Sequence, residues 1–212
     1  AREDVFLTTK VWMDKVGYDQ TKRSTEESLG KLKTDYVDLL LIHWPSDEAP
    51  LEETLEAMAA LRQEGRARFI GVSNFNVALL KKTVEELKAD MLCNQVEYHP
   101  YLSQQPVLDY LRAHDMFLTA YSPIARGKTA KDDTLKAIGD QYGKSPVQVA
   151  LRWLIQQDRV AAIPKASSRE HCRANFEIFD FELSDEQMGR ISALARPDGR
   201  LIDPSWAPRW DT

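Results

Sequence analysis

The segment Asp38–Pro45 constrains the fold of this chain more than any other feature. It is a continuous apolar run that ends in His43 and Trp44 and is closed by a proline, which cannot extend a central strand. Apolar runs of this length are typical of strands that are buried on both faces, as in a parallel sheet. A lone histidine is usually a satisfied core residue, but α/β barrels place their chemistry at the carboxyl ends of such strands.

A second strand pattern ends in a similar way. Val5–Thr9 is rich in β-branched and aromatic residues, Lys10 follows it, and Trp12 lies two residues later. Two strands that each bring a polar group and a tryptophan to one rim predict an apolar pocket with a few convergent polar groups.

Composition limits the class of protein. With 212 residues, 43% of them hydrophobic, the chain can form one sizeable core, and we expect a single domain over residues 1–212. The net charge of −5 and the scattered basic residues argue against nucleic acid as a partner. No apolar stretch is long enough to span a membrane, and the amino terminus lacks the apolar core of a secretory signal.

The number and spacing of the cysteines also limit the class of protein. Cys93 and Cys172 are the only cysteines, and neither stands in a metal-ligand spacing. The two cysteines could form one disulfide, but two thiols in a reducing cytosol are the simpler interpretation. We therefore expect no metal centre and a cytoplasmic, enzyme-like protein.

Strand and helix patterns alternate along the chain, which predicts an α/β fold with about six strands in a parallel sheet. After Lys10, strands are expected at residues 38–42, 68–73, 91–96, 116–121 and 160–164. Helices are expected at 19–33 (capped by Thr21 or Ser24), 51–64 (stopped by Gly65), 77–89 and 106–114. A pair of helices is expected over 134–157, followed by two more helices and an irregular tail at 196–212.

Polar residues recur at the ends of these strands. A barrel would gather them around one point, whereas an open sheet would spread them along a line. The chain has no GxGxxG fingerprint, so a bound nucleotide would not be held by a Rossmann turn. The tail is either a packed terminus or a loop over the barrel mouth. The residues at the strand ends are Lys10, His43, Ser73, Gln95, Tyr121 and Lys165.

Six segments in a fixed order make this chain resemble the aldo-keto reductases, (β/α)8 TIM barrels that reduce carbonyls with NADPH. The resemblance covers essentially the whole chain, and its carboxyl-terminal region is most similar to bacterial 2,5-diketo-gluconate reductases. The segments are Thr8–Trp12, Thr34–Asp38 leading into Leu41–Pro45, Ile70–Phe75, Asn94–Tyr101, Ala120–Pro123, and Ile163–Lys165 followed by Asn175.

The family's catalytic tetrad is aspartate, tyrosine, lysine and histidine. The resemblance assigns the lysine to Lys10 and the histidine to His43. The tyrosine and aspartate follow the family's second strand, and no segment here matches that pattern. We therefore expect the chain to be the carboxyl-terminal three-quarters of such a barrel, lacking the first two βα units. The implied function is NADPH-dependent reduction of aldehydes, α-dicarbonyls or keto-sugars by hydride transfer.

The cofactor residues are nearly complete. The resemblance implies that Ser73, Asn74 and Gln95 hold the nicotinamide carboxamide, that Tyr121 stacks on the nicotinamide, and that Ser122 lies along the pyrophosphate. It also implies that Lys165 meets the adenosine 2′-phosphate, aided by Ser168, His171 and Asn175. The family often has arginine where His171 stands, so we expect NADPH to be preferred over NADH with weaker discrimination.

Aromatic side chains define the expected substrate site. The resemblance implies that Trp12 and Trp44 wall it, that Trp206 closes it, and that the protein is a monomer acting on a small carbonyl compound. The alternative is a non-catalytic NADP-binding barrel subunit or an inactive truncated reductase. Retention of both Lys10 and His43 argues against a pure binding protein.

Overall fold

The computed structural model describes residues 1–211, and within them six strands form one sheet in chain order. Pairing is parallel, with Val11 opposite Ile42 and Ile42 opposite Val72, so these strands end at a common edge. The prediction of an α/β fold with about six strands is confirmed. The strands are β1 (Thr8–Val11), β2 (Val37–Ile42), β3 (Ala67–Ser73), β4 (Cys93–Glu97), β5 (Phe117–Tyr121) and β6 (Val160–Ala162).

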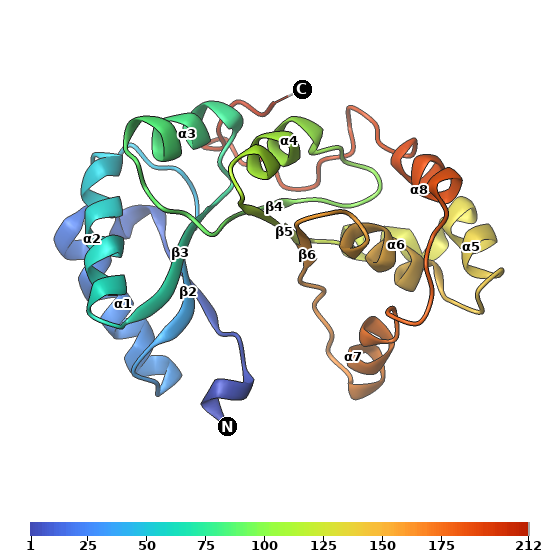
Figure 1. Cartoon of the computed structure of the whole chain (residues 1–212), viewed down its shortest axis with the longest axis horizontal. Helices are drawn as coiled ribbons and strands as arrows, with labels where there is room; N and C mark the ends of the chain where they lie inside the picture. The colour runs from blue at the N-terminus through green and yellow to red at the C-terminus, as the bar shows by residue number, and fades with distance from the viewer. Residues whose placement is uncertain (212) are drawn as a thin grey trace. The chain divides into compact units, whose positions relative to one another are not determined.

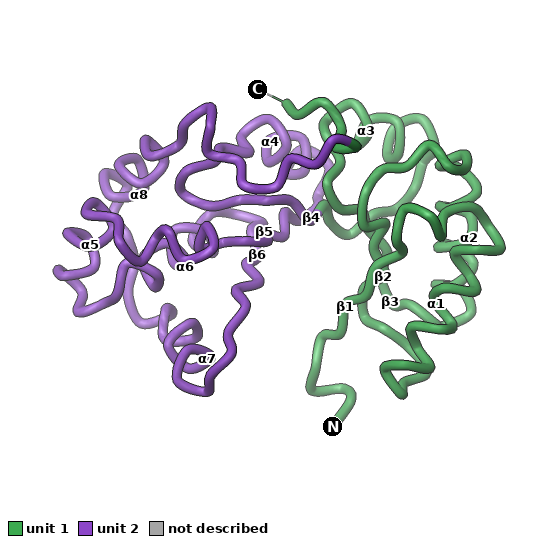
Figure 2. Tube along the Cα trace, turned by 180° about the vertical axis from the view of Figure 1, so that it is seen from behind, with its two compact units in different colours: residues 1–94, 206–212 green, residues 95–205 purple. Residues whose placement is uncertain are grey.

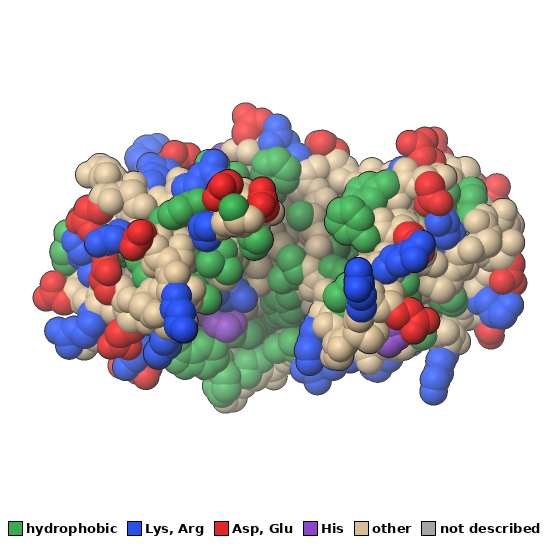
Figure 3. Space-filling model, turned by 90° about the horizontal axis from the view of Figure 1, so that it is seen from below, with side chains coloured by type: hydrophobic (Ala, Val, Ile, Leu, Met, Phe, Trp, Pro, Cys, Tyr) green, Lys and Arg blue, Asp and Glu red, His purple; other side chains and the backbone are tan. Residues whose placement is uncertain are grey.

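Helices follow the strands along the chain (Figure 1). In residues 1–211, no helix has both the length and the hydrophobicity needed to cross a membrane. On the face seen in Figure 3, cationic and anionic side chains are interspersed. The helices are α1 (Tyr18–Leu32), α2 (Leu51–Gln63), α3 (Val77–Lys81), α4 (Gln105–Ala113), α5 (Asp133–Gly139), α6 (Pro146–Ile155), α7 (Arg169–Phe176) and α8 (Asp185–Ser192).

The chain divides into two compact units (Figure 2). Unit 1 contains residues 1–94 together with 206–212, and unit 2 contains residues 95–205. The chain therefore passes between the units twice, after Asn94 and after Ser205.

Unit 1 is built on β1, β2 and β3, with α1 and α2 packed on one another beside these strands (Figure 1). Every residue of β2 is buried, as the apolar run Asp38–Pro45 predicted. Met58 and Leu61 of α2 are fully buried. Each such side chain contributes roughly 2 kcal/mol through burial, so the apolar side of α2 holds it in place.

A buried carboxylate with two partly exposed arginine partners lies at the start of β2. The carboxylate of Asp38 accepts a hydrogen bond from the backbone N–H of Leu7 at 2.9 Å. It also forms ion pairs with Arg2 and Arg68, each at 2.8 Å. These contacts fix the segment that precedes β1.

Unit 2 is built around α6, which contacts β6, α5, α7 and α8. Ser145 and Gln148 form a capping box at its start, the arrangement that satisfies free N–H groups at a helix end. Leu151 and Leu154 of this helix are buried, as is Leu118 of β5.

Three local predictions are wrong. The first strand begins at Thr8 and includes Lys10, whereas Val5 is exposed. No side chain caps α1: it begins after Gly17, whose φ of 86° suits glycine, and Thr21 and Ser24 lie inside the helix. The expected helix at 77–89 is α3 followed by a π-helical turn over Lys82–Glu86.

Candidate functional site

Lys10 and His43 lie at the carboxyl ends of adjacent strands in unit 1. Lys10 is opposite Leu41 in the β1–β2 register, and the backbone N–H of His43 donates to the carbonyl of Val11 at 3.0 Å. Trp12 packs edge-on against the His43 ring, with centroids 4.8 Å apart and planes at 82°. The structure therefore brings together the lysine, the histidine and one tryptophan of the predicted site.

The environment sets the charge of both groups. Burial lowers the pKa of Lys10. Burial, and after it the positive charge of Lys10, lowers the pKa of His43 to about 4. The imidazole is consequently neutral at pH 7, and a neutral imidazole carries one N–H that can donate a hydrogen bond.

Ser73 and Asn74 follow at the end of β3, and both are buried. The Asn74 side-chain amide donates to the backbone carbonyl of His43 at 2.9 Å and to Ser73 Oγ at 3.1 Å. Asn74 also has a φ of 63°, a left-handed conformation that costs energy for residues other than glycine and is often found at functional sites. Asn74 is thus bonded directly to the backbone of His43, and Ser73 is linked to it through Asn74.

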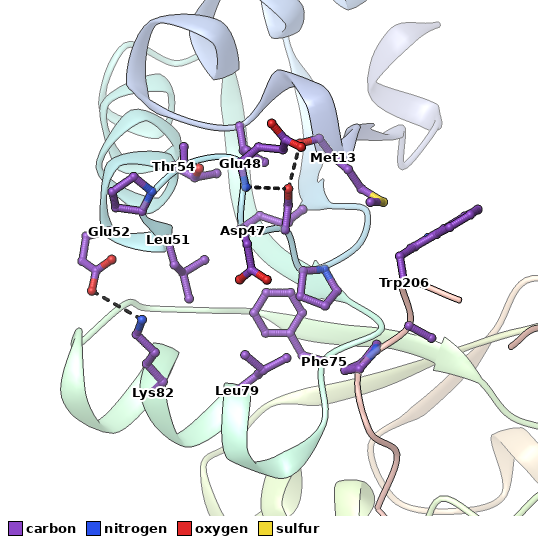
Figure 4. A pocket seen from close by; sticks show the side chains of 18 residues that line it. Met13, Asp47, Glu48, Leu51, Glu52, Thr54, Phe75, Leu79, Lys82 and Trp206 are labelled. Atoms are coloured by element: carbon purple, nitrogen blue, oxygen red, sulfur yellow. Dashed lines mark hydrogen bonds and ion pairs between the residues drawn. The ribbon is translucent and has the colours of Figure 1, made fainter. Parts of the chain in front are cut away.

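The three tryptophans predicted to bind substrate occupy different settings. Trp12 contacts His43, as described above. Trp44 is buried and packs edge-on against Trp210, with centroids 6.1 Å apart. Trp206 is 52% exposed and lines a cavity of about 1030 Å³ in unit 1 (Figure 4).

The cavity beside Trp206 lies between the start of α2, the start of α3 and residues 206–208. Ile42, Phe75 and Leu79 are among its apolar lining, and an ion pair between Glu52 and Lys82, at 3.6 Å, lies at its edge (Figure 4). Lys10, His43, Trp12 and Trp44 are not part of the lining. The joint role of the three tryptophans remains a prediction.

Sequence analysis missed the residues that anchor the end of the tail in unit 1. Asn76 donates through its amide to the carbonyl of Arg209 at 2.8 Å, and Asp211 accepts from the N–H of Val77 at 2.9 Å. Asn76 also caps α3, which its position before an apolar run could have indicated. Its partner lies 133 residues away, and no local pattern identifies such a contact.

In unit 2, Gln95 and Tyr121 lie on β4 and β5, and Gln95 is buried. The N–H of Tyr98 donates to the carbonyl of Tyr121 at 3.3 Å. Burial and then the charge of Glu97 raise the pKa of Tyr121, so its phenol is neutral at pH 7. Ser122 follows with a φ of 49°, a second strained position among the predicted cofactor residues.

The predicted adenosine contacts lie around α7. Lys165 and Asn175 line one cavity of about 520 Å³. Ser168 caps α7 by accepting a hydrogen bond from the N–H of His171 at 3.1 Å, so both residues lie at the start of that helix. Ser168 and His171 are not part of the lining of this cavity, which takes its α7 residues from Cys172 onward. The joint role of the four residues in holding a 2′-phosphate remains a prediction.

Comparison with known proteins identifies relatives of this chain. The model of the aldo/keto reductase family matches residues 1–196. A methylglyoxal reductase, DkgB, from Salmonella typhi is 38% identical over 99% of this chain and 79% of its own length.

Solved structures extend the comparison. A candidate 2,5-diketo-D-gluconic acid reductase B matches with a TM-score of 0.97 and 46% identity, over all of this chain and 76% of its own. A Bombyx mori aldo-keto reductase solved with NADP matches with a TM-score of 0.87 and 36% identity, over 97% and 72%. The expected family and barrel-type fold are confirmed.

Proposed function

Because this chain belongs to the aldo/keto reductase family, whose members reduce carbonyl groups with NADPH, we propose that it acts on small α-dicarbonyl compounds and keto-sugars. The observation that carries this proposal is the placement of Lys10 and His43 at one edge of β1 and β2, with Trp12 packed on the histidine.

His43 positions the carbonyl that is reduced. Its pKa of about 4 keeps the imidazole neutral, so its N–H donates to the carbonyl oxygen without giving up a proton. As negative charge develops on that oxygen, the hydrogen bond becomes stronger and stabilises the transition state. Asn74 supports this geometry because its side chain is bonded to the backbone of His43.

Lys10 supplies positive charge at the same edge. An ammonium group beside a phenol favours the phenolate and lowers the pKa of the phenol. In the family a tyrosine gives the proton that completes the alcohol, and we assign to Lys10 the role of lowering the pKa of that tyrosine. The residues that would hold the cofactor are Ser73, Asn74, Gln95, Tyr121, Ser122, Lys165, Ser168, His171 and Asn175. When bound, NADPH supplies the hydride.

The substrate class follows from the relatives and from the walls of the site. One relative is named for methylglyoxal and another for 2,5-diketo-D-gluconic acid, and both compounds carry more than one carbonyl. Trp12 is 45% exposed beside His43, so it offers an apolar surface next to the hydrogen-bond donor. That combination suits a small carbonyl compound with a short carbon chain.

The test combines intact mass, cofactor binding and turnover of the protein purified from its source. We expect NADPH to bind, and methylglyoxal to be reduced with one NADPH consumed per carbonyl. His43→Gln should lower kcat at least tenfold while changing NADPH affinity little, because the residue acts on the carbonyl oxygen.

Two outcomes would contradict the proposal. The first concerns a protein whose intact mass is large enough to contain the segment that carries the family's tyrosine. If that protein binds NADPH but reduces no dicarbonyl, keto-sugar or aldehyde, the non-catalytic NADP-binding alternative is favoured. The second is failure of the protein to bind NADPH, which would contradict both the reductase proposal and the NADP-binding alternative.

A further inference from the structure

A fully buried carboxylate lies in unit 2, outside the residues assigned above. Glu97, the last residue of β4, and His99 are both 0% exposed. Glu97 Oε1 accepts from the N–H of Leu201 at 2.7 Å, and its Oε2 accepts from the N–H of Ile202 at 2.9 Å. The Nε2 of His99 lies 2.9 Å from Oε1.

These contacts join segments that are more than 100 residues apart in the sequence. Removing a carboxylate from water is costly unless hydrogen bonds replace the lost hydration. Here two backbone N–H groups and an imidazole provide them. Leu201 and Ile202 lie outside any helix or strand, so Glu97 also satisfies donors that no secondary structure would satisfy.

The segment Arg196–Ile202, which we call the tail root, is held at further points. The N–H of Arg196 donates to the carbonyl of Tyr101 at 3.2 Å. A Cβ on Gly199 would overlap that same carbonyl oxygen, so only glycine allows this approach. The tail root therefore follows residues 97–101 closely.

The position of Glu97 in the chain links it to the proposed reaction. It lies two residues after Gln95, a predicted nicotinamide-binding residue, and its charge acts on Tyr121. On its other side it holds Ile202, four residues before Trp206, the residue predicted to cover the substrate.

We propose that Glu97 is a positioning residue that fixes the tail root, and that this placement of the tail favours substrate binding. The kinetic part rests on the proposed reductase function, whereas the structural part does not. Glu97 does not touch the carbonyl that is reduced; it acts through the backbone of Leu201 and Ile202.

Hydrogen exchange of the unmodified protein tests the structural part without any variant. The amides of Leu201 and Ile202 should exchange as slowly as those of β4, although neither lies in a strand. Exchange as fast as that of the exposed residue Ser205 would overturn the proposal.

Glu97→Gln is the matching variant, because it keeps the size but replaces one acceptor oxygen with an NH2 group that faces an N–H. We expect the rate of amide exchange at Leu201 and Ile202 to rise roughly tenfold or more. A rise of this size corresponds to the loss of one hydrogen bond to a charged group. KM for methylglyoxal should rise several-fold, with kcat and NADPH affinity changed less than about threefold.

Gln104→Leu is the control. Gln104 is also buried, and its side-chain amide donates to the backbone carbonyl of Glu97 at 2.7 Å, whereas the N–H groups of Leu201 and Ile202 donate to the Glu97 carboxylate. This variant should leave exchange at Leu201 and Ile202 unchanged.

The outcomes separate the two proposals. Faster exchange at the tail root with no reductase activity in either protein would refute the proposed function and keep the structural role of Glu97. A fall in kcat with unchanged KM would refute positioning through substrate binding. Equal exchange in the variant and the unmodified protein would refute the role altogether.

Discussion

Lys10 and His43 are electrostatically coupled: burial, together with the positive charge of Lys10, lowers the pKa of His43 to about 4. The coupling follows from the β1–β2 register, which brings the two residues to one edge of the sheet. A cation beside an imidazole disfavours the imidazolium, and this keeps the N–H donor neutral over the physiological range.

Lys10→Met should raise the pKa of His43, since the repulsive charge is lost while burial remains. The value should stay below 6.5, the ordinary value for histidine. NMR titration of the His43 ring protons measures this directly. Lys15→Met is the control, because Lys15 is an exposed lysine that pairs with Asp14. An unchanged His43 pKa in Lys10→Met would contradict the coupling.

Asp38→Asn should lower the free energy of unfolding at pH 7 by roughly 1–3 kcal/mol, because a neutral amide loses the charge-assisted hydrogen bonds that the carboxylate accepts from Arg2 and Arg68. Asp140→Asn removes an exposed pair with Lys136 and should cost less than about 0.5 kcal/mol. Urea unfolding of the three proteins gives both values. Equal losses in the two variants would show that the network does not stabilise the fold.

Asp38 should also make stability depend on pH. Burial alone would raise its pKa, but hydrogen bonds from Leu7, Arg2 and Arg68 outweigh burial and lower it to about 2. A carboxyl with a lowered folded pKa stabilises the fold above its unfolded pKa, near 3.8, and this contribution is lost as pH falls toward 2. The stability difference between the unmodified protein and Asp38→Asn should therefore shrink between pH 4 and pH 2. A constant difference would contradict this assignment.

Gly71→Ala should destabilise unit 1 by roughly 2 kcal/mol. A Cβ there would lie 2.7 Å from the carbonyl oxygen of Cys93 and 2.9 Å from Leu41 Cδ2. Gly30→Ala is the matched control: it lies inside α1 with no atom within 4 Å of the added Cβ. It should stabilise the protein by roughly 0.5–1 kcal/mol, the ordinary gain of alanine over glycine in a helix. Thermal unfolding should shift in opposite directions, and a shift in the same direction would argue against the close approach at β3.

His171→Arg should increase the preference for NADPH over NADH roughly tenfold, because the bidentate arginine fork binds phosphate more strongly than an imidazole ring can. Fluorescence titration with each cofactor gives the ratio of dissociation constants. Arg173→Ala is the control, since Arg173 is exposed and pairs with Glu177 at 2.7 Å. No change in the ratio would indicate that His171 does not face the 2′-phosphate.

Much of the fold was predictable because its signals are local. The apolar run of β2 predicted a fully buried strand, and Gly65, with a φ of 74°, follows α2 where a helix stop was expected. Prediction was weaker where tertiary contacts override local preference. Val5 and Phe6 have strand-forming side chains, yet they precede β1, and the contacts of Asp38 hold this segment instead.

The sequence by itself determined the strand–helix order, the edge at which Lys10 and His43 lie, and the family motifs around them, because each depends on periodicity or on a short run of residues. Only the tertiary structure decided how the tail is held. Trp210 packs on Trp44, Asp211 accepts from Val77, and Glu97 holds the tail root, each across about 100 residues or more. A side chain's partner at that separation is set by how the elements pack, and packing is not encoded in any local pattern.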